Sequence, residues 1–221
     1  MTRDELARYL DHTLLLPDAT AKDIEQLVHE ALIWNTYAVC VNSAYVAQAL
    51  KTRSGPHTLK IAATVGFPLG QSLTQAKVAE TIAAIEAGAD EIDVVWNLGL
   101  FLSNDRSGVY DDLHRVIQAA QHIPVKVILE TGRLTPDQIR IGAQIAVDAG
   151  AHTVKTSTGF QFGGATIEAV SLLRQTVGPT IGVKASGGIR TYEDAIHMIA
   201  AGATRIGLSK TEAVLARAPL S

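Results

Sequence analysis

The stretch DAGAHTVKTSTGF, residues 148–160, contains in one place the features that decide the fold. A helical pattern ends at Gly150, and glycine readily takes the left-handed conformation that closes a helix. A short β-branched run follows at once, and a polar turn that contains Gly159 follows the run. A helix that passes directly into a buried strand is typical of repeated βα units and therefore of a parallel sheet.

The same helix-to-strand joint occurs twice more, in EAGADEI at 86–92 and in AAGATRI at 200–206. Along the chain, amphipathic stretches alternate with short apolar runs, and the strand candidates are YLDHTLL, YAVCV, TLKIAATV, EIDVVW, PVKVILE, HTVKT, TIGVKA and TRIGLS. Eight strands at about 27 residues per unit predict a single-domain (β/α)8 TIM barrel over residues 1–221, with a short N-terminal helix. A doubly wound open sheet is the alternative, but no G-x-G-x-x-G follows the first strand.

Composition limits the classes of partner. The 221 residues carry a net charge of −3, so no basic footprint for nucleic acid is present. Apolar runs are interrupted well before the roughly 20 residues of a membrane span, and MTRDELARYL lacks a signal-peptide core. The lone Cys40 lies in an apolar run and is expected to be an inert core thiol. We therefore expect a cytoplasmic protein that binds small molecules and copies of itself, and neither nucleic acid nor membrane.

Side-chain alternation directs three charged residues into the expected barrel. In TIGVKA, Ile181 and Val183 must face the helices, which turns Lys184 inward. The same parity turns Lys155 inward in HTVKT and Asp93 inward in EIDVV. We expect all three near the C-terminal ends of their strands, where barrel enzymes build their sites.

Two neighbouring lysines and a carboxylate suit amine chemistry. Burying an isolated ammonium is costly, and a second ammonium close by lowers the pKa of the first. One of the two lysines would then activate the other as a nucleophile, while Asp93 could transfer protons, directly or through water. The alternative is a structural ion network that fills the barrel. Two inward lysines that each precede a glycine turn favour chemistry.

The last quarter of the chain predicts a phosphate site. SGGIR follows the seventh strand candidate and IGLSK contains the end of the eighth, which is where such barrels bind phosphate with backbone N–H groups. Taken singly, each glycine is more often a turn former, so the prediction depends on their joint position. The candidate substrate-binding and phosphate-binding residues are Gly159, Gly187, Gly188, Arg190, Gly207 and Ser209.

Other polar positions leave two interpretations open. Side-chain alternation turns Asp11 and Lys126 toward the barrel interior, where they either form a buried acid–base pair or serve as a proton relay. Thr156, with Ser157 and Thr158, either holds water and hydroxyl groups or forms an ordinary polar turn. The seven histidines show no metal-ligand spacing, so we expect no metal.

Eight motifs together identify a family resemblance: LDHTLLLPDAT, AVCVN, TVGFPLG, EIDVV, VILETG, VKTSTGF, VKASGGIR and IGLS. Through nearly its whole length the chain resembles the deoxyribose-phosphate aldolase family, class I aldolases on a (β/α)8 barrel. The resemblance implies reversible cleavage of 2-deoxy-D-ribose 5-phosphate to D-glyceraldehyde 3-phosphate and acetaldehyde, in deoxyribonucleotide catabolism. It implies no cofactor, and a homodimer or homotetramer.

The resemblance also assigns roles by motif. Lys155 in KTSTG would form the Schiff base with the substrate. Lys184 in VKASGG would perturb the pKa of that lysine and assist proton transfer. Asp93 in EIDVV would donate and accept protons.

The chain departs from the family pattern at several positions. Many relatives have lysine at Leu16, proline at Ser43, an aliphatic residue at Trp96 and alanine at Ser186. None of these departures removes a predicted catalytic group, but they leave the pocket shape open. The closing RAPLS lacks the C-terminal tyrosine that some members use in proton transfer, so we expect water and Asp93 to take that role.

Two other functions compete with the aldolase. A phosphate-binding barrel isomerase or synthase, like those of histidine or thiazole biosynthesis, accounts equally well for the phosphate loops, but it does not account for both inward lysines. A sugar-phosphate-binding barrel without catalysis is the second, and the intact lysines and aspartate argue against it.

Overall fold

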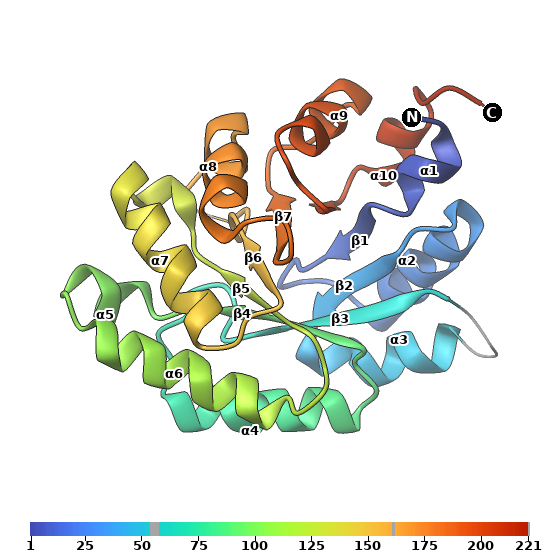
Figure 1. The fold of residues 1–221 in the computed structure, drawn as a ribbon. Helices are drawn as coiled ribbons and strands as arrows, with labels where there is room; N and C mark the ends of the chain where they lie inside the picture. Colours follow the sequence, from blue (N-terminus) through green and yellow to red (C-terminus); the bar gives the residue numbers. More distant parts are fainter. Residues whose placement is uncertain (54–57, 161, 221) are drawn as a thin grey trace.

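A computed structural model describes residues 1–53, 58–160 and 162–220. Eight strands form one closed parallel barrel in the order of the sequence, with β8 paired to β1. Figure 1 shows the strands at the centre with the helices outside them. The closed barrel confirms the predicted fold and excludes an open doubly wound sheet. The strands are β1 (Leu10–Leu14), β2 (Ala38–Asn42), β3 (Lys60–Val65), β4 (Glu91–Val95), β5 (Val125–Ile128), β6 (Thr153–Lys155), β7 (Gly182–Ser186) and β8 (Arg205–Leu208).

At least one α-helix follows every strand, and a short helix precedes the first, as predicted. The α-helices are α1 (Arg3–Ala7), α2 (Ala21–Trp34), α3 (Val46–Arg53), α4 (Thr74–Glu86), α5 (Leu98–Leu102), α6 (Arg106–Ala119), α7 (Pro136–Asp148), α8 (Ile167–Val177), α9 (Tyr192–Ala200) and α10 (Thr211–Leu215). Two single turns of 3₁₀ helix, η1 (Ser43–Tyr45) and η2 (Thr131–Arg133), follow β2 and β5. Among the described residues, none of the helices has the length and apolar character needed to cross a membrane.

The helix boundaries follow from local sequence. Thr20 caps α2 and Thr135 caps α7 in capping boxes, in which a side chain three residues later returns a hydrogen bond. Gly88, Gly150 and Gly202 take φ values of +106°, +105° and +111° just after α4, α7 and α9. Only glycine adopts this conformation without strain, so the three predicted joints form for the same steric reason.

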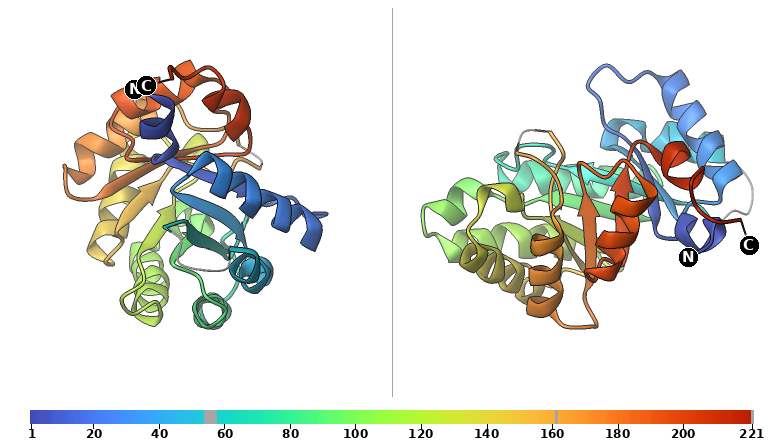
Figure 2. Two further views of the ribbon diagram at one scale, coloured as in Figure 1. Left: turned by 90° about the vertical axis from the view of Figure 1, so that its right-hand side faces the viewer. Right: turned by 90° about the horizontal axis from the view of Figure 1, so that it is seen from above.

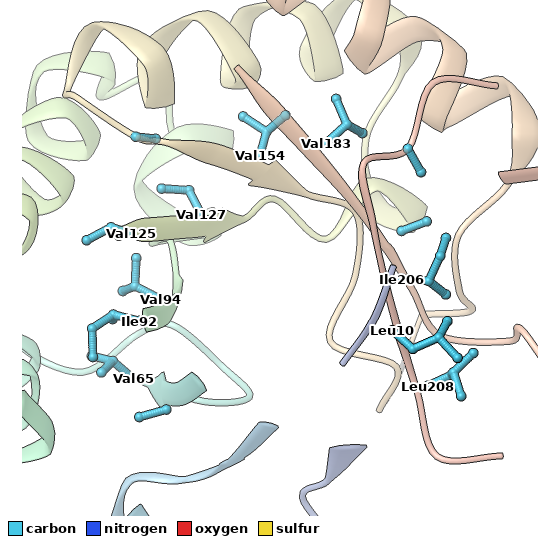
Figure 3. Packing of buried hydrophobic residues seen from close by; sticks show 14 of the residues in the cluster. Leu10, Val65, Ile92, Val94, Val125, Val127, Val154, Val183, Ile206 and Leu208 are labelled. Carbon is cyan, nitrogen blue, oxygen red and sulfur yellow. The ribbon is translucent and has the colours of Figure 1, made fainter. Parts of the chain in front are cut away.

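The main hydrophobic core lies between the strands and the helices. Figure 3 shows Val94, Val127, Val154 and Val183 among the buried side chains of this layer. They lie on the strand faces opposite to those that carry the charged residues, as side-chain alternation predicts. The packing of this layer turns the remaining strand face toward the barrel axis.

The barrel interior has a small apolar region next to β1–β3. Leu15, Cys40 and Ala62 form a separate buried cluster, and Phe67 packs on it. Cys40 is fully buried, and burial raises the pKa of its thiol. The prediction of a buried core cysteine is therefore confirmed.

The first and last helices lie side by side. Figure 2 shows α1 close to α10, and the Arg3 N–H donates to the Pro219 carbonyl at 2.9 Å. This contact holds the N-terminal helix at the end of the barrel where β1 begins.

Candidate active site

Asp93 lies at the centre of the charged barrel interior. The Lys155 and Lys184 ammonium groups each donate to its Oδ2 at 2.8 Å, and Lys126 donates to its Oδ1 at 2.7 Å. All four side chains are buried. The structure therefore brings together the three residues that the sequence singled out, and adds Lys126 as a third lysine on the same carboxylate.

Asp11 is the second acid of this group. It pairs with Lys184 through Oδ2 and with Arg205 through Oδ1, the latter at 3.1 Å. Lys126 pairs instead with Glu91 at 2.6 Å and with Asp93. Asp11 and Lys126 thus both lie in buried ion pairs, as one of the two interpretations expects, but each bonds to other partners of opposite charge.

Sequence reasoning missed two members of the group, Glu91 and Arg205. Glu91 stands two residues before Asp93 on β4, and Arg205 stands two residues before Gly207 on β8. The inward parity that identified Asp93 could have identified both. We call the seven residues the interior charge cluster: Asp11, Glu91, Asp93, Lys126, Lys155, Lys184 and Arg205.

Burial and neighbouring charge oppose each other in this cluster. Burial alone would raise the pKa of Asp93, but Lys126, Lys155 and Lys184 outweigh burial and hold that pKa well below its usual range. Burial would lower the pKa of Lys184, but Asp11 and Asp93 outweigh it and raise that pKa. Asp93 is therefore a carboxylate and Lys184 an ammonium in the resting protein.

The three predicted residues hold slightly different positions along their strands. Lys155 is the last residue of β6, whereas Asp93 and Lys184 each lie two residues before the last residue of β4 and β7. All three therefore lie within two residues of the C-terminal ends of their strands. Lys155 and Lys184 are register partners on the neighbouring strands β6 and β7. Of the lysines in the cluster, Lys155 borders the open end of the barrel.

A cavity of about 500 Å³ opens above Lys155 at the C-terminal end of the strands. Leu14 and Leu16 from the β1 end and Lys210 from the β8 end form part of its wall, and Leu16 is 56% exposed. The six residues predicted to bind substrate or phosphate all line this one cavity: Gly159, Gly187, Gly188, Arg190, Gly207 and Ser209. One chamber thus joins a buried amine to glycine turns and two exposed cations, Arg190 and Lys210.

The turn after β7 is suited to bind an anion. Gly187 and Gly188 both have positive φ, +83° and +79°. Within the described ranges, their N–H groups donate to no protein acceptor, which leaves two adjacent donors at the cavity wall. The N–H group of Arg190, by contrast, donates to Asp194 Oδ2 at 3.0 Å. The N-terminus of α9 is therefore already capped, and the predicted cradle depends on the glycines.

The polar turn after Lys155 is held by hydrogen bonds within the protein. Thr156 Oγ1 accepts from the Ser186 N–H at 3.1 Å and donates to the Ser186 carbonyl at 3.3 Å. Thr158 Oγ1 donates to Glu130 Oε2 at 2.5 Å. Thr156 and Ser157 are fully buried, so Thr158 is the hydroxyl of the three that lines the cavity.

The four departures from the family pattern differ in position. Leu16 and Ser186 line the cavity above Lys155. Ser43 donates to Glu80 Oε1 at 2.6 Å, outside that cavity. Trp96 packs on Phe101 and borders a separate cavity of about 280 Å³. Leu16 and Ser186 are therefore the departures that change the wall of the chamber.

No group of three or more His, Cys, Asp and Glu side chains in the described part of the chain is arranged to hold a metal ion. His57 and Ser221, which belong to the predictions on metal ligands and on the C-terminus, lie outside the described residues.

A parallel eight-stranded barrel with charged side chains under a cavity at the C-terminal ends of its strands defines a TIM-barrel enzyme. A model of the "DeoC/LacD family aldolase" matches residues 6–215. The chain therefore belongs to the deoxyribose-phosphate aldolase family, which confirms the resemblance seen in its motifs, and it is an aldolase.

Individual relatives agree with this assignment. The chain is 50% identical over 202 residues to a deoxyribose-phosphate aldolase of Streptococcus equi subsp. zooepidemicus, and the match covers 91% of each chain. A solved structure described as "QR15, an Aldolase" is 39% identical with a TM-score of 0.91, over 96% of this chain and 95% of that one. The deoxyribose phosphate aldolase of Aeropyrum pernix, described as having a unique tetrameric structure, is 35% identical with a TM-score of 0.88, over 97% and 91%.

Proposed function

We propose that the protein cleaves 2-deoxy-D-ribose 5-phosphate reversibly to acetaldehyde and D-glyceraldehyde 3-phosphate through a Schiff base on Lys155. One observation carries the proposal. The Lys155 amine lies under a cavity whose other wall bears the Gly187–Gly188 turn, and it shares the Asp93 carboxylate with Lys184. The names of the relatives support the substrate.

The geometry supports Lys155 as the nucleophile. Lys155 borders the cavity, whereas Lys184 is completely buried between Asp11 and Asp93. In the proposed reaction Lys155 attacks as the neutral amine, and Lys184 bonds to the same Asp93 oxygen beside it. The Nζ atoms of Lys155 and Lys184 lie close together because both bond to Asp93 Oδ2.

The reaction then proceeds in balanced steps. The Lys155 nitrogen attacks the C1 aldehyde, and loss of water leaves a protonated imine. A base removes the proton of the C3 hydroxyl, the C2–C3 bond breaks, and its electron pair moves toward the imine to give an enamine. D-glyceraldehyde 3-phosphate leaves, C2 is protonated, and water hydrolyses the imine to acetaldehyde and free amine. We assign the proton transfers to the ionised Asp93, acting directly or through water.

The phosphate would occupy the glycine end of the cavity. The free N–H groups of Gly187 and Gly188 offer hydrogen-bond donors, and Arg190 and Lys210 line the same chamber. With the phosphate there, the aldehyde end of a five-carbon chain extends toward Lys155. Gly159, Gly207 and Ser209 complete the proposed binding wall.

Borohydride trapping tests the proposal directly. The protein is incubated with acetaldehyde and borohydride, and the adduct is located by peptide mass spectrometry. We expect a reduced two-carbon adduct on Lys155 that is absent in Lys155→Leu, together with cleavage of deoxyribose 5-phosphate by the unmodified protein. An adduct on Lys184 would reverse the roles of the two lysines. Absence of a specific adduct would favour the isomerase or the binding barrel.

We also propose a homodimer or homotetramer that acts in deoxyribonucleotide catabolism in the cytoplasm. The tetrameric description of the Aeropyrum relative supports assembly, as do exposed apolar side chains such as Ile33 and Leu73, each 77% exposed. Light scattering tests the assembly, and a monomer mass at micromolar concentration would exclude it.

A further inference from the structure

Ser186 lies between the two ends of the proposed substrate site. It is the last residue of β7, two positions beyond Lys184 on the same inward face. The Gly187–Gly188 turn follows it directly, and Ser186, which is 6% exposed as a residue, lines the cavity together with Lys155. A chain bound from Lys155 to the glycine turn therefore passes Ser186.

The hydrogen bonds of Ser186 determine what it can offer a ligand. Its hydroxyl donates to the Ser157 carbonyl at 2.6 Å. A serine hydroxyl has one proton and two lone pairs, so this bond uses the proton and leaves lone pairs. The Ser186 N–H and carbonyl are also engaged, by Thr156 and by the Ala165 N–H. Toward the cavity, Ser186 can act only as a hydrogen-bond acceptor.

A group that donates to Ser186 must be a hydroxyl in the middle of the substrate. The proposed substrate has two there, on C3 and C4. The C3 hydroxyl loses its proton during cleavage and therefore needs a proton-transfer group. The C4 hydroxyl keeps its proton, lies next to the phosphate-bearing carbon, and remains as the hydroxyl of the product aldehyde.

We propose that Ser186 is a specificity-determining residue that accepts a hydrogen bond from the C4 hydroxyl of the sugar phosphate. It thereby selects acceptor aldehydes that carry a hydroxyl beside the aldehyde carbon. This inference rests on the proposed aldolase function. Lys184, the nearest inward polar group on β7, is paired with two carboxylates and is not free to take this role.

The test runs the reaction in the direction of synthesis with acetaldehyde as donor. Two acceptors are compared, D-glyceraldehyde 3-phosphate and 3-oxopropyl phosphate, which lacks the hydroxyl. In the unmodified enzyme we expect a higher kcat/KM for the hydroxylated acceptor. In Ser186→Ala and in Ser186→Cys, which keeps the volume, we expect this ratio to fall about three- to tenfold, the effect of one neutral hydrogen bond.

Thr156→Val is the matched control, because it removes the bonds between Thr156 and the Ser186 backbone without changing a cavity-lining side chain. It should lower both rates by one factor and leave the ratio unchanged. The amount of adduct that borohydride traps with acetaldehyde alone measures the fraction of each variant that can form the imine, and both rates are divided by this fraction. An unchanged ratio in active Ser186→Ala and Ser186→Cys would reduce Ser186 to a structural role. No product from either acceptor with the unmodified enzyme would overturn the proposed function, and this inference with it.

Discussion

Two buried ion pairs of lysine, one on the outside of the barrel and one in its interior, show how a structural lysine differs from one in the candidate site. Between α4 and α6, the fully buried Lys77 donates to Asp112 at 2.8 Å and to the Val95 carbonyl at 3.0 Å. In the interior charge cluster, Lys155 and Lys184 share one oxygen of Asp93. Burial lowers the pKa of Lys77, whereas two carboxylates outweigh burial and raise that of Lys184.

The comparison shows that a buried lysine paired with an acid does not by itself mark a catalytic site. Lys77 has one acid to itself, and Thr74 Oγ1 donates to the other oxygen of that acid at 2.8 Å. Lys77 lines neither of the two cavities described above, whereas Lys155 lines the large chamber. Competition for one carboxylate and access to a cavity distinguish the two groups.

The largest expected difference is in activity. Lys155→Met removes the proposed nucleophile and should lower kcat for deoxyribose 5-phosphate cleavage by on the order of 10³-fold or more. Lys77→Met should leave kcat and KM within about threefold at temperatures where it is folded. Steady-state assays of both variants make the comparison, and a 10³-fold loss in Lys77→Met would place that residue in the catalytic machinery.

The second difference is in stability. Lys77→Met leaves the buried Asp112 carboxylate without its ammonium, which should lower the free energy of unfolding by about 3–5 kcal/mol. In Lys77→Met/Asp112→Leu no charge is stranded, so much of that loss should be recovered. Denaturant titrations followed by circular dichroism measure both. If the double variant is no more stable than the single one, packing rather than charge dominates at this pair.

The third difference is in the dependence on pH. The lowered pKa values of Asp11 and Asp93 contribute stability that is fully present above about pH 3.9, the ordinary pKa of an unfolded aspartate. This stability is lost as the pH falls, because the unfolded chain binds protons before the folded protein does. The raised pKa values of Lys126 and Lys184 contribute stability that is fully present below about pH 10.4, the ordinary pKa of an unfolded lysine. This stability is lost as the pH rises, because the unfolded chain releases protons before the folded protein does.

Thermal unfolding across this range should therefore show a plateau with falling acid and alkaline limbs. Lys184→Met should flatten the alkaline limb, whereas Lys77→Met should retain it. Equal alkaline limbs in the unmodified protein and in Lys184→Met would contradict the assignment of that limb to the cluster.

The smallest expected effect compares two glycines with similar φ angles. Gly188 and Gly178 have φ of +79° and +71°, and an added Cβ would meet nothing closer than 3.9 Å at either. Alanine should lower stability by about 1 kcal/mol at both positions. Only Gly188→Ala should also raise KM for deoxyribose 5-phosphate, because Gly188 lines the chamber. Equal KM values in the two variants would remove Gly188 from the phosphate site.

Much of the fold follows from local sequence. The glycine joints at Gly88, Gly150 and Gly202 and the strand alternation predict eight strands and their inner faces, because both depend on backbone sterics. The pairing of Lys184 with Asp11 of β1 and with Asp93 of β4 could not be derived. It depends on barrel register, which brings residues from distant strands together and has no local signature.

The site was predicted to a similar extent. Side-chain alternation predicts that Lys155, Lys184 and Asp93 lie together, and the glycine turns predict part of the cavity wall. The cap of α9 by Asp194 has a local signature, because TYED at 191–194 has the spacing of a capping box. Thr158 and Glu130 form a contact that only the folded loops create.

The interior charge cluster contains four basic and three acidic side chains, so it carries one excess positive charge when every group is ionised. Deprotonation of one lysine brings the cluster to electroneutrality. Lys155 is the lysine of the cluster that lines the chamber, so it is the one that a small molecule can reach without opening the barrel. Under the proposed chemistry, the form of the protein with a free amine is also the form in which the charges of its interior balance.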